Sequence, residues 1–113
     1  VADFLAEVLA RLGQLDPGIG SLTVGHLGDG NLHFTAFPTQ ADAVLQDRVL
    51  ATVEDVVAEM GGSFSAEHGV GLSKLPSMAR RKDPVALDVM RAVKAALDPK
   101  NLLNPGKVIP APA

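Results

Sequence analysis

Residues 22–37 read LTVGHLGDGNLHFTAF, two extended runs on either side of a Gly-Asp-Gly segment. The runs at 22–24 and 32–37 contain the β-branched and aromatic residues that favour strands. A central Asp-Gly between such runs is a strong hairpin signal, because a type I′ turn needs positive φ at both central positions. We therefore predict a β-hairpin whose turn lies at Asp29 and Gly30.

Such a turn would place His26 directly opposite His33, with Cβ atoms roughly 4.5 to 5.5 Å apart on one face of the hairpin. The same face holds Val24, Thr35 and Phe37. One interpretation is an ordinary pair of exposed or buried histidines. The other is a pair of metal ligands on a face that another part of a larger enzyme covers, and the apolar residues around the imidazoles favour it.

Helical periodicity dominates the remainder of the chain. We expect, in chain order, a helix at 2–12 ending at Gly13, a long helix at 41–60 ending at Gly61, a short strand at 63–65, a short helix at 76–81, a last helix at 83–97 and an extended surface tail from Asp98. This order predicts an α+β fold, an antiparallel sheet with helices packed on one face. It forms a single domain over 1–113 and looks like most of a ferredoxin-like subdomain.

Composition argues against several classes of function. The 113 residues carry a net charge of -3 without a basic cluster and contain no Trp or Tyr, so nucleic acid is not an expected partner. No secretory leader or membrane-spanning run is visible, and we expect a cytoplasmic protein, at most peripheral to a membrane. Without Cys, a metal must be held by His, Asp or Glu. The chain opens inside an amphipathic helix without Met, so we expect a part of a longer protein.

A second cluster of polar residues is SAEHGVG at 65–71, where a predicted strand enters a Gly-rich loop. Glu67 and His68 are either ordinary loop residues or functional groups, since binding and catalytic side chains concentrate on such loops. With the two hairpin histidines, Glu67 would complete a His₂Glu set that leaves coordination positions open, as catalytic sites do. The set suits zinc, which we expect, and also manganese or iron. Ser65 lacks the GxSxG context of a nucleophile, so we expect its hydroxyl to be structural.

The segments GHLGDGNLHF (25–34), SAEHGVG (65–71) and LDPKNLLNPGK (97–107) resemble the C-terminal region of FAD-linked oxidases of the vanillyl-alcohol-oxidase type. The likeness is strongest to the branch that contains D-2-hydroxyglutarate dehydrogenase, D-lactate dehydrogenase and the flavoprotein subunit of glycolate oxidase. It covers residues 21–109 in the same order and relative spacing. The resemblance implies an FAD cofactor, bound mainly by an N-terminal domain of the same protein.

The resemblance also implies roles for individual residues. His26, His33 and Glu67 match the metal ligands of the family. His68 matches its catalytic base.

Two further positions carry weaker matches. Thr35 stands where the hydroxyglutarate enzymes often have a substrate-contacting Asn, which implies a substrate-binding residue and leaves the exact substrate open. Asn104 matches a family asparagine close to the flavin, and the equal alternative is a turn residue before Pro105.

The function implied by these matches is the oxidation of a small D-2-hydroxy acid to a 2-oxo acid by hydride transfer to flavin. The metal would polarise the substrate oxygens while His68 removes the hydroxyl proton. Two other classes remain, a non-catalytic metal-binding or assembly subdomain and a His₂Glu metallohydrolase. We expect this chain alone to be inactive. The electron acceptor is not specified by the sequence, and exposed apolar surface would favour a homo-oligomer.

Overall fold

The computed structural model describes residues 1–112, which form two compact units that divide between Phe64 and Ser65. In chain order the elements are α1 (Ala2–Leu15), β1 (Gly20–His26), β2 (Asn31–Phe37), α2 (Ala43–Glu59), the 3₁₀ helix η1 (Leu72–Lys74), α3 (Leu75–Arg81) and α4 (Pro84–Leu97). No helix in this described part is long and apolar enough to cross a bilayer. The expectation of a single domain stays a prediction, and each unit is described by itself.

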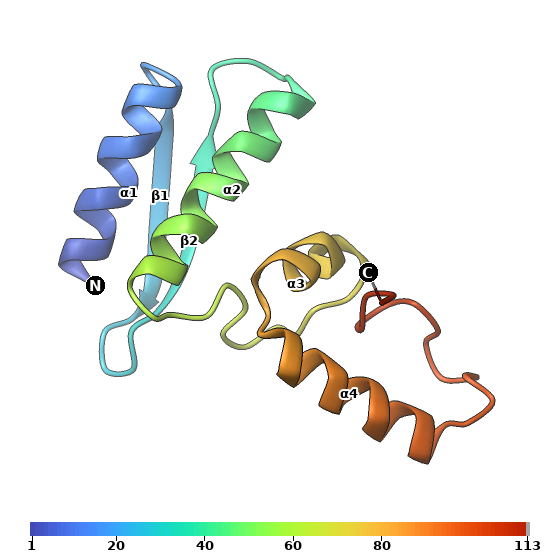
Figure 1. Ribbon diagram of the computed structural model, residues 1–113. Helices are drawn as coiled ribbons and strands as arrows, with labels where there is room; N and C mark the ends of the chain where they lie inside the picture. Colours follow the sequence, from blue (N-terminus) through green and yellow to red (C-terminus); the bar gives the residue numbers. More distant parts are fainter. Residues whose placement is uncertain (113) are drawn as a thin grey trace. The chain divides into compact units, whose positions relative to one another are not determined.

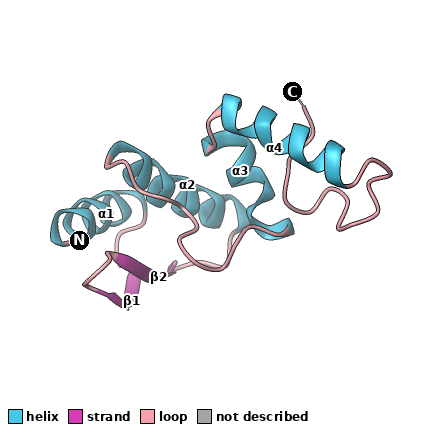
Figure 2. Ribbon diagram, turned by 90° about the horizontal axis from the view of Figure 1, so that it is seen from below, coloured by secondary structure: helices cyan, strands magenta, loops and turns pink. Residues whose placement is uncertain are grey.

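The first unit is a hairpin of β1 and β2 with α1 and α2 on one of its faces (Figures 1 and 2). The two strands pair antiparallel and are the strands that residues 1–112 contain. This arrangement confirms the predicted α+β class with helices on one face of an antiparallel sheet. The ferredoxin-like topology stays a prediction.

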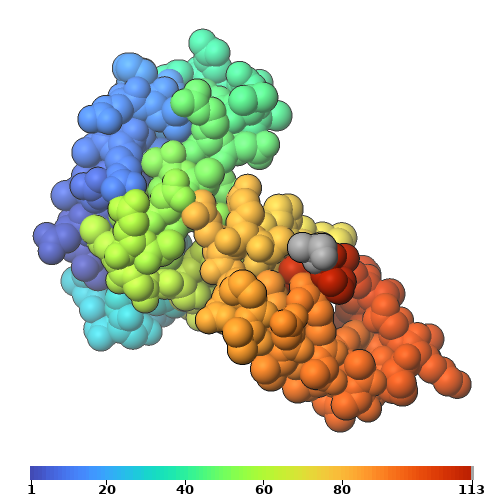
Figure 3. All heavy atoms as spheres, in the orientation of Figure 1, coloured from blue at the N-terminus to red at the C-terminus, as the bar shows by residue number. Residues whose placement is uncertain are grey.

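The core of the first unit lies between the two helices and the hairpin. Its buried members are Val8, Leu12, Val49 and Val56. Phe34 and Ala36 of β2 pack against this cluster, which identifies the side of the hairpin that faces the helices. Figure 3 shows side chains of α1, in blue, meeting those of α2, in green. Burying side chains of this size contributes about 1.5–3 kcal/mol each, so the helices hold the hairpin mainly through apolar contacts.

Helix α1 continues past Gly13, where the sequence predicted its end. Leu12 and Leu15 on either side of Gly13 both pack in the core, and this burial outweighs the cost of about 1 kcal/mol for a helical glycine. The helix ends at Asp16, whose carboxylate accepts hydrogen bonds from Thr39 N at 2.8 Å and Thr39 Oγ1 at 2.6 Å. These bonds tie the end of α1 to the segment after β2.

Arg11 joins α1 to α2 at the surface. Its guanidinium donates to both carboxylate oxygens of Glu59, at 3.0 and 2.6 Å, and to Glu7 at 2.6 Å. The hydrogen bond with Glu59, followed by that with Glu7, raises the pKa of Arg11, and the bond from Arg11 lowers the pKa of Glu59. Solvent reaches all three side chains, so these pairs orient the helices more than they stabilise the unit.

Helix α2 confirms the prediction at 41–60 to within two residues. The carboxylate of Asp42 accepts from Val44 N at 2.9 Å and caps the first turn. At the other end Gly61 adopts a φ of +71°, a conformation that glycine takes without steric cost.

The short strand predicted at 63–65 does not form. A strand needs a hydrogen-bonded neighbour, and within residues 1–112 β1 and β2 pair only with each other. The prediction was wrong because it considered only the local composition of these residues, whereas a strand also depends on a second strand that pairs with it.

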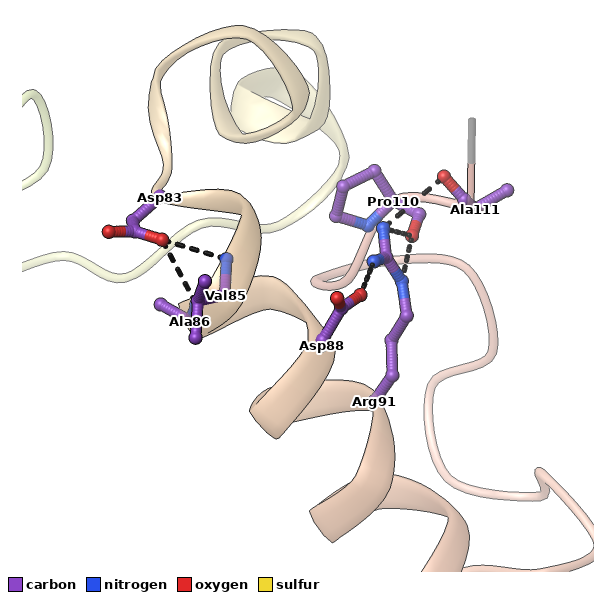
Figure 4. Close-up of polar contacts among 7 residues, drawn as sticks. All are labelled: Asp83, Val85, Ala86, Asp88, Arg91, Pro110 and Ala111. Atoms are coloured by element: carbon purple, nitrogen blue, oxygen red, sulfur yellow. Dashed lines mark hydrogen bonds and ion pairs between the residues drawn. The ribbon is translucent and has the colours of Figure 1, made fainter.

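The second unit contains η1, α3 and α4. Asp83 caps α4, since its Oδ1 accepts from Val85 N at 2.7 Å and from Ala86 N at 3.4 Å (Figure 4). Pro84 occupies the first helical position, where no amide hydrogen is needed. The helix predicted at 83–97 is confirmed.

The residues after α4 turn back at Asp98. Its carboxylate accepts from the amides of Leu102 and Leu103, both at 2.9 Å, and pairs with the ammonium of Lys94. Lys94 Nζ also donates to Leu103 O at 2.6 Å. Four hydrogen bonds therefore fold this stretch, which the sequence predicted to be extended.

The far end of the tail is held by Arg91 of α4. Its Nη2 donates to the carbonyl oxygen of Pro110 at 3.1 Å, while its Nη1 donates to Asp88 at 2.8 Å (Figure 4). Pro110 is buried, although most of the tail is exposed as expected. The tail thus packs along the unit rather than trailing from it.

Candidate functional site

The hairpin has a different register from the predicted one. His26 pairs with Asn31, and Val24 pairs with His33. The prediction that the two imidazoles stand directly opposite each other is therefore wrong.

The loop between the strands explains the difference. Four residues, Leu27 to Gly30, connect β1 to β2 instead of two. Only Gly30 among them has a positive φ, +68°, whereas a type I′ turn would need one at Asp29 as well. Asp29 Oδ1 instead accepts a hydrogen bond from Asn31 N at 3.2 Å, a local turn that Asp favours.

The two histidines nevertheless share one face of the hairpin. The register differs from the prediction by two residues, and side chains alternate with a period of two, so each stays on its predicted face. His26 and His33 are diagonal neighbours, a relationship that places residues about 7–8 Å apart and within reach of long side chains. Asn31, directly opposite His26, is a polar neighbour that the sequence analysis missed, although it lies two residues from His33 on the same strand.

Gly25 allows the strands to approach next to His26. A Cβ built on Gly25 would lie 2.4 Å from the carbonyl oxygen of Asn31 and 2.8 Å from Leu32 Cδ2. Side-chain atoms do not tolerate such distances, so this register requires glycine at position 25. The position thereby fixes His26 relative to the facing strand.

The histidine face of the hairpin is exposed and largely apolar. Its large apolar members are Leu22, Val24 and Phe37, which are 57%, 61% and 54% exposed. Thr35, the predicted substrate-binding residue, lies on this face two residues from His33. Exposed apolar residues gathered in this way are typical of interaction surfaces. That another part of a larger enzyme covers this face stays a prediction.

Glu67 and His68 belong to the second unit, whereas the hairpin histidines belong to the first. Glu67 Oε1 lies 3.2 Å from His68 Nε2, and the two side chains are 38% and 70% exposed. Gly69 and Gly71 have φ values of +75° and +65°, which glycine adopts readily. The loop therefore presents a carboxylate oxygen and an imidazole nitrogen side by side, both of which are atom types that bind metals.

Ser65 and Lys74 close the loop that carries this pair. Ser65 Oγ donates to Gly69 O at 2.6 Å, and Lys74 Nζ donates to Ser65 Oγ at 2.9 Å and to Gly69 O at 3.3 Å. Ser65 thus has the structural role expected of it. The role of Lys74 could not be predicted from the sequence, because no periodic pattern connects it to the loop.

Asn104 lies in the tail of the second unit and has a positive φ of +46°. Its carbonyl accepts a hydrogen bond from Lys107 N at 3.3 Å, which closes a turn through Pro105 and Gly106. A Pro-Gly pair at the centre of a turn suits type II geometry, and Gly106 has the positive φ this requires, +68°. The turn role is observed, and the flavin contact stays a prediction.

Comparison with known proteins identifies similar chains. The family model of FAD linked oxidases, C-terminal domain, matches residues 1–108. A D-2-hydroxyglutarate dehydrogenase of Stutzerimonas stutzeri is 38% identical over 98% of this chain and 25% of its own length. The mitochondrial D-2-hydroxyglutarate dehydrogenase of Rattus norvegicus is 42% identical over 98% of this chain and 20% of its own.

A third relative carries a different name. Glycolate oxidase subunit GlcD of Bacillus subtilis is 41% identical over 80% of this chain and 20% of its own length. This chain therefore spans between a fifth and a quarter of these curated relatives.

Proposed function

Because this chain belongs to the family of FAD linked oxidases, C-terminal domain, we propose that it is the substrate- and metal-binding part of an enzyme that oxidises a D-2-hydroxy acid to a 2-oxo acid. The observation that carries the proposal is the exposed hairpin face on which both imidazoles lie. The names of the relatives, D-2-hydroxyglutarate dehydrogenase and glycolate oxidase subunit GlcD, support the 2-hydroxy acid class. The flavin-binding domain belongs to the remainder of the full-length protein.

The proposed metal ligands are His26, His33 and Glu67. The residues present fit a divalent cation, because two imidazoles share one exposed face and Glu67 is partly exposed in its loop. Nitrogen and oxygen donors of this kind suit zinc, with manganese or iron as alternatives. A bound divalent cation would supply Lewis acidity to the carboxylate and hydroxyl oxygens of the substrate.

His68 is the proposed base, which takes the proton of the substrate hydroxyl onto its imidazole. The ring is 70% exposed, so a substrate can reach it, and Glu67 at Nε2 orients it. The contacts of Ser65 and Lys74 hold the loop in place. The chemistry that FAD supplies when bound is acceptance of the hydride that leaves C2, so the product is a 2-oxo acid.

Thr35 and Asn104 are the proposed substrate and flavin contacts. Thr35 shares the exposed face with His33, so its hydroxyl is available to a ligand bound there. Asn104 is exposed in its turn, which leaves its side chain accessible. Both roles are supported by the family positions that these residues match.

The test uses the full-length protein and measures metal content, flavin absorbance and 2-hydroxy acid oxidation together. His26→Ala/His33→Ala should lose both metal and turnover, whereas His68→Ala should lose turnover and keep the metal. Leu22→Ala, on the same face but without a donor atom, is the matched control and should keep both. Unchanged metal content in the double variant would overturn the ligand assignment, and full turnover in His68→Ala would overturn the base.

Two results would favour the other classes. A colourless, metal-loaded full-length protein that oxidises no hydroxy acid would indicate a metal-binding or assembly subdomain. Metal-dependent cleavage of esters or amides without flavin would indicate a hydrolase.

A further inference from the structure

Asn31 lies between the two histidines that are proposed to bind a metal. It pairs directly with His26 across the hairpin and precedes His33 by two positions on β2. Directly opposite residues, and residues two apart on one strand, have their side chains on the same face of a sheet. Asn31 therefore neighbours both imidazoles on the face of the hairpin that lies away from α1 and α2 (Figure 2).

Most other side chains that β1 and β2 place on this face are apolar. Those without any hydrogen-bonding atom are Leu22, Val24 and Phe37. Thr35 has a hydroxyl, but it pairs with Leu22 and lies farther from His26 than Asn31 does. Apart from the second imidazole, Asn31 is thus the one paired residue of β1 and β2 on this face that has an acceptor oxygen beside His26.

The backbone of Asn31 is held from two sides. Its N–H donates to Asp29 Oδ1 at 3.2 Å within the hairpin loop. Its carbonyl oxygen packs so closely on Gly25 that a Cβ there would lie 2.4 Å away. Because Gly25 precedes His26, the two strands are in close contact beside this pair, and Asn31 is half-buried. A carboxamide on a backbone fixed in this way loses little conformational freedom when it makes a hydrogen bond.

An imidazole that binds a metal has a requirement that Asn31 can meet. One ring nitrogen binds the cation, and the other carries a hydrogen whose acceptor fixes the tautomer and the orientation of the ring. The Cβ atoms of directly opposite residues lie about 4.5–5.5 Å apart, whereas residues two apart on one strand are separated by about 6.4–6.8 Å. The carboxamide of Asn31 is therefore better placed to serve His26 than His33.

We propose that Asn31 is a positioning residue of the metal site, whose carboxamide oxygen accepts a hydrogen bond from the ring N–H of His26. This role rests on the proposed function, in which His26 and His33 bind a divalent cation. The oxygen has two lone pairs and the amide nitrogen has two hydrogens, so Asn31 can hold His26 and keep other contacts. Asn31 acts through His26 and is not itself a ligand, because zinc in proteins takes histidine, cysteine and carboxylate ligands.

The affinity of the metal-stripped, full-length protein for zinc tests this role. Asn31→Leu has a similar size but no acceptor, and it should weaken zinc binding roughly tenfold to a hundredfold. Asn31→Asp keeps an acceptor at the same position, so it should bind zinc at least as tightly as the wild type. An affinity of Asn31→Leu equal to that of the wild type would overturn the proposal, and so would an equal loss in Asn31→Leu and Asn31→Asp.

Two further variants separate this role from a general effect on the hairpin. Asn31→Ala removes the acceptor without adding bulk, and it should lose zinc affinity as Asn31→Leu does. Val24→Ala is the matched control, because Val24 stands opposite His33 in the same ladder and offers no hydrogen bond. It should bind zinc as the wild type does. A loss in Val24→Ala as large as that in Asn31→Ala would overturn the specific role of the carboxamide.

His26→Ala/His33→Ala in the same zinc titration separates the two proposals. If this double variant binds zinc as tightly as the wild type, the ligand assignment fails and the role of Asn31 fails with it. If the double variant loses zinc while Asn31→Leu and Asn31→Ala keep the affinity of the wild type, the ligand assignment stands and only the role of Asn31 fails.

Discussion

His33 stands directly opposite Val24 across the hairpin, which leaves His26 as its diagonal neighbour on the same face. An imidazole carries its nitrogens well beyond Cβ, so a diagonal pair can reach a common ligand. Such a ligand would bridge two strands rather than two residues of one strand. Changes that slip β1 against β2 should therefore disturb ligand binding even when both imidazoles are intact.

Gly25→Ala should disturb the register. The added Cβ would meet the carbonyl oxygen of Asn31 at 2.4 Å, and overpacking of this kind costs about 1–3 kcal/mol in the free energy of unfolding. Chemical denaturation of the full-length protein measures this loss. Gly28→Ala is the control, because a Cβ there meets nothing within 4 Å and Gly28 has no positive φ. Equal midpoints for the two variants would contradict the steric argument.

Asp98 should stabilise the second unit in an acid-sensitive way. The hydrogen bond from Lys94, followed by those from the amides of Leu102 and Leu103, lowers the pKa of Asp98 to about 2. The unfolded carboxyl titrates near 3.9, so this contribution is fully present above about pH 4 and is lost as the pH falls towards 2. Asp98→Asn should flatten the dependence of the denaturation midpoint on pH in that interval. A slope identical to that of the wild type would exclude the effect.

Asp83→Ala should weaken α4 at its first turn. It removes the acceptor for Val85 N and Ala86 N, and loss of such a cap typically costs about 1 kcal/mol. Asp83→Ser keeps an acceptor of similar reach and should recover most of the loss. Urea denaturation followed by circular dichroism compares the two, and equal destabilisation by Ala and Ser would argue against capping.

Lys74→Met should loosen the loop that carries Glu67 and His68, because it removes both hydrogen bonds from the ammonium to Ser65 and Gly69. Amide exchange across the loop should become several-fold faster, and turnover of the full-length enzyme should fall with it. Lys82→Met is the control, since Lys82 is exposed and follows α3. An unchanged exchange rate in Lys74→Met would mean that the bond from Ser65 alone holds the loop.

The elements that the sequence predicted correctly depend on local interactions. Helix α2 was predicted because its apolar periodicity and its end at Gly61 both lie within the segment. The errors arose where distant contacts decide. Helix α1 passes Gly13 because its neighbours are buried in the core, and the strand at 63–65 fails to form without a partner strand.

For the candidate site, the sequence predicted which residues share a face but not how far apart they lie. Alternation along the strands placed His26, His33 and Thr35 together, and that result survives a register shift of two residues. Their direct opposition depended on a positive φ at Asp29, which residue type alone does not determine. The contacts of Lys74 follow no period and could not be read from the sequence.

The four-residue hairpin loop has a consequence for how this protein can change its length during evolution. A codon inserted between Val24 and His26, or between Asn31 and His33, would shift the alternation of side chains and turn one histidine towards the core. Two inserted codons would restore the faces, and insertions in the loop itself would leave both strands as they are. Within the strands, only even numbers of inserted or deleted residues keep the side chains on their faces. The loop tolerates odd numbers as well.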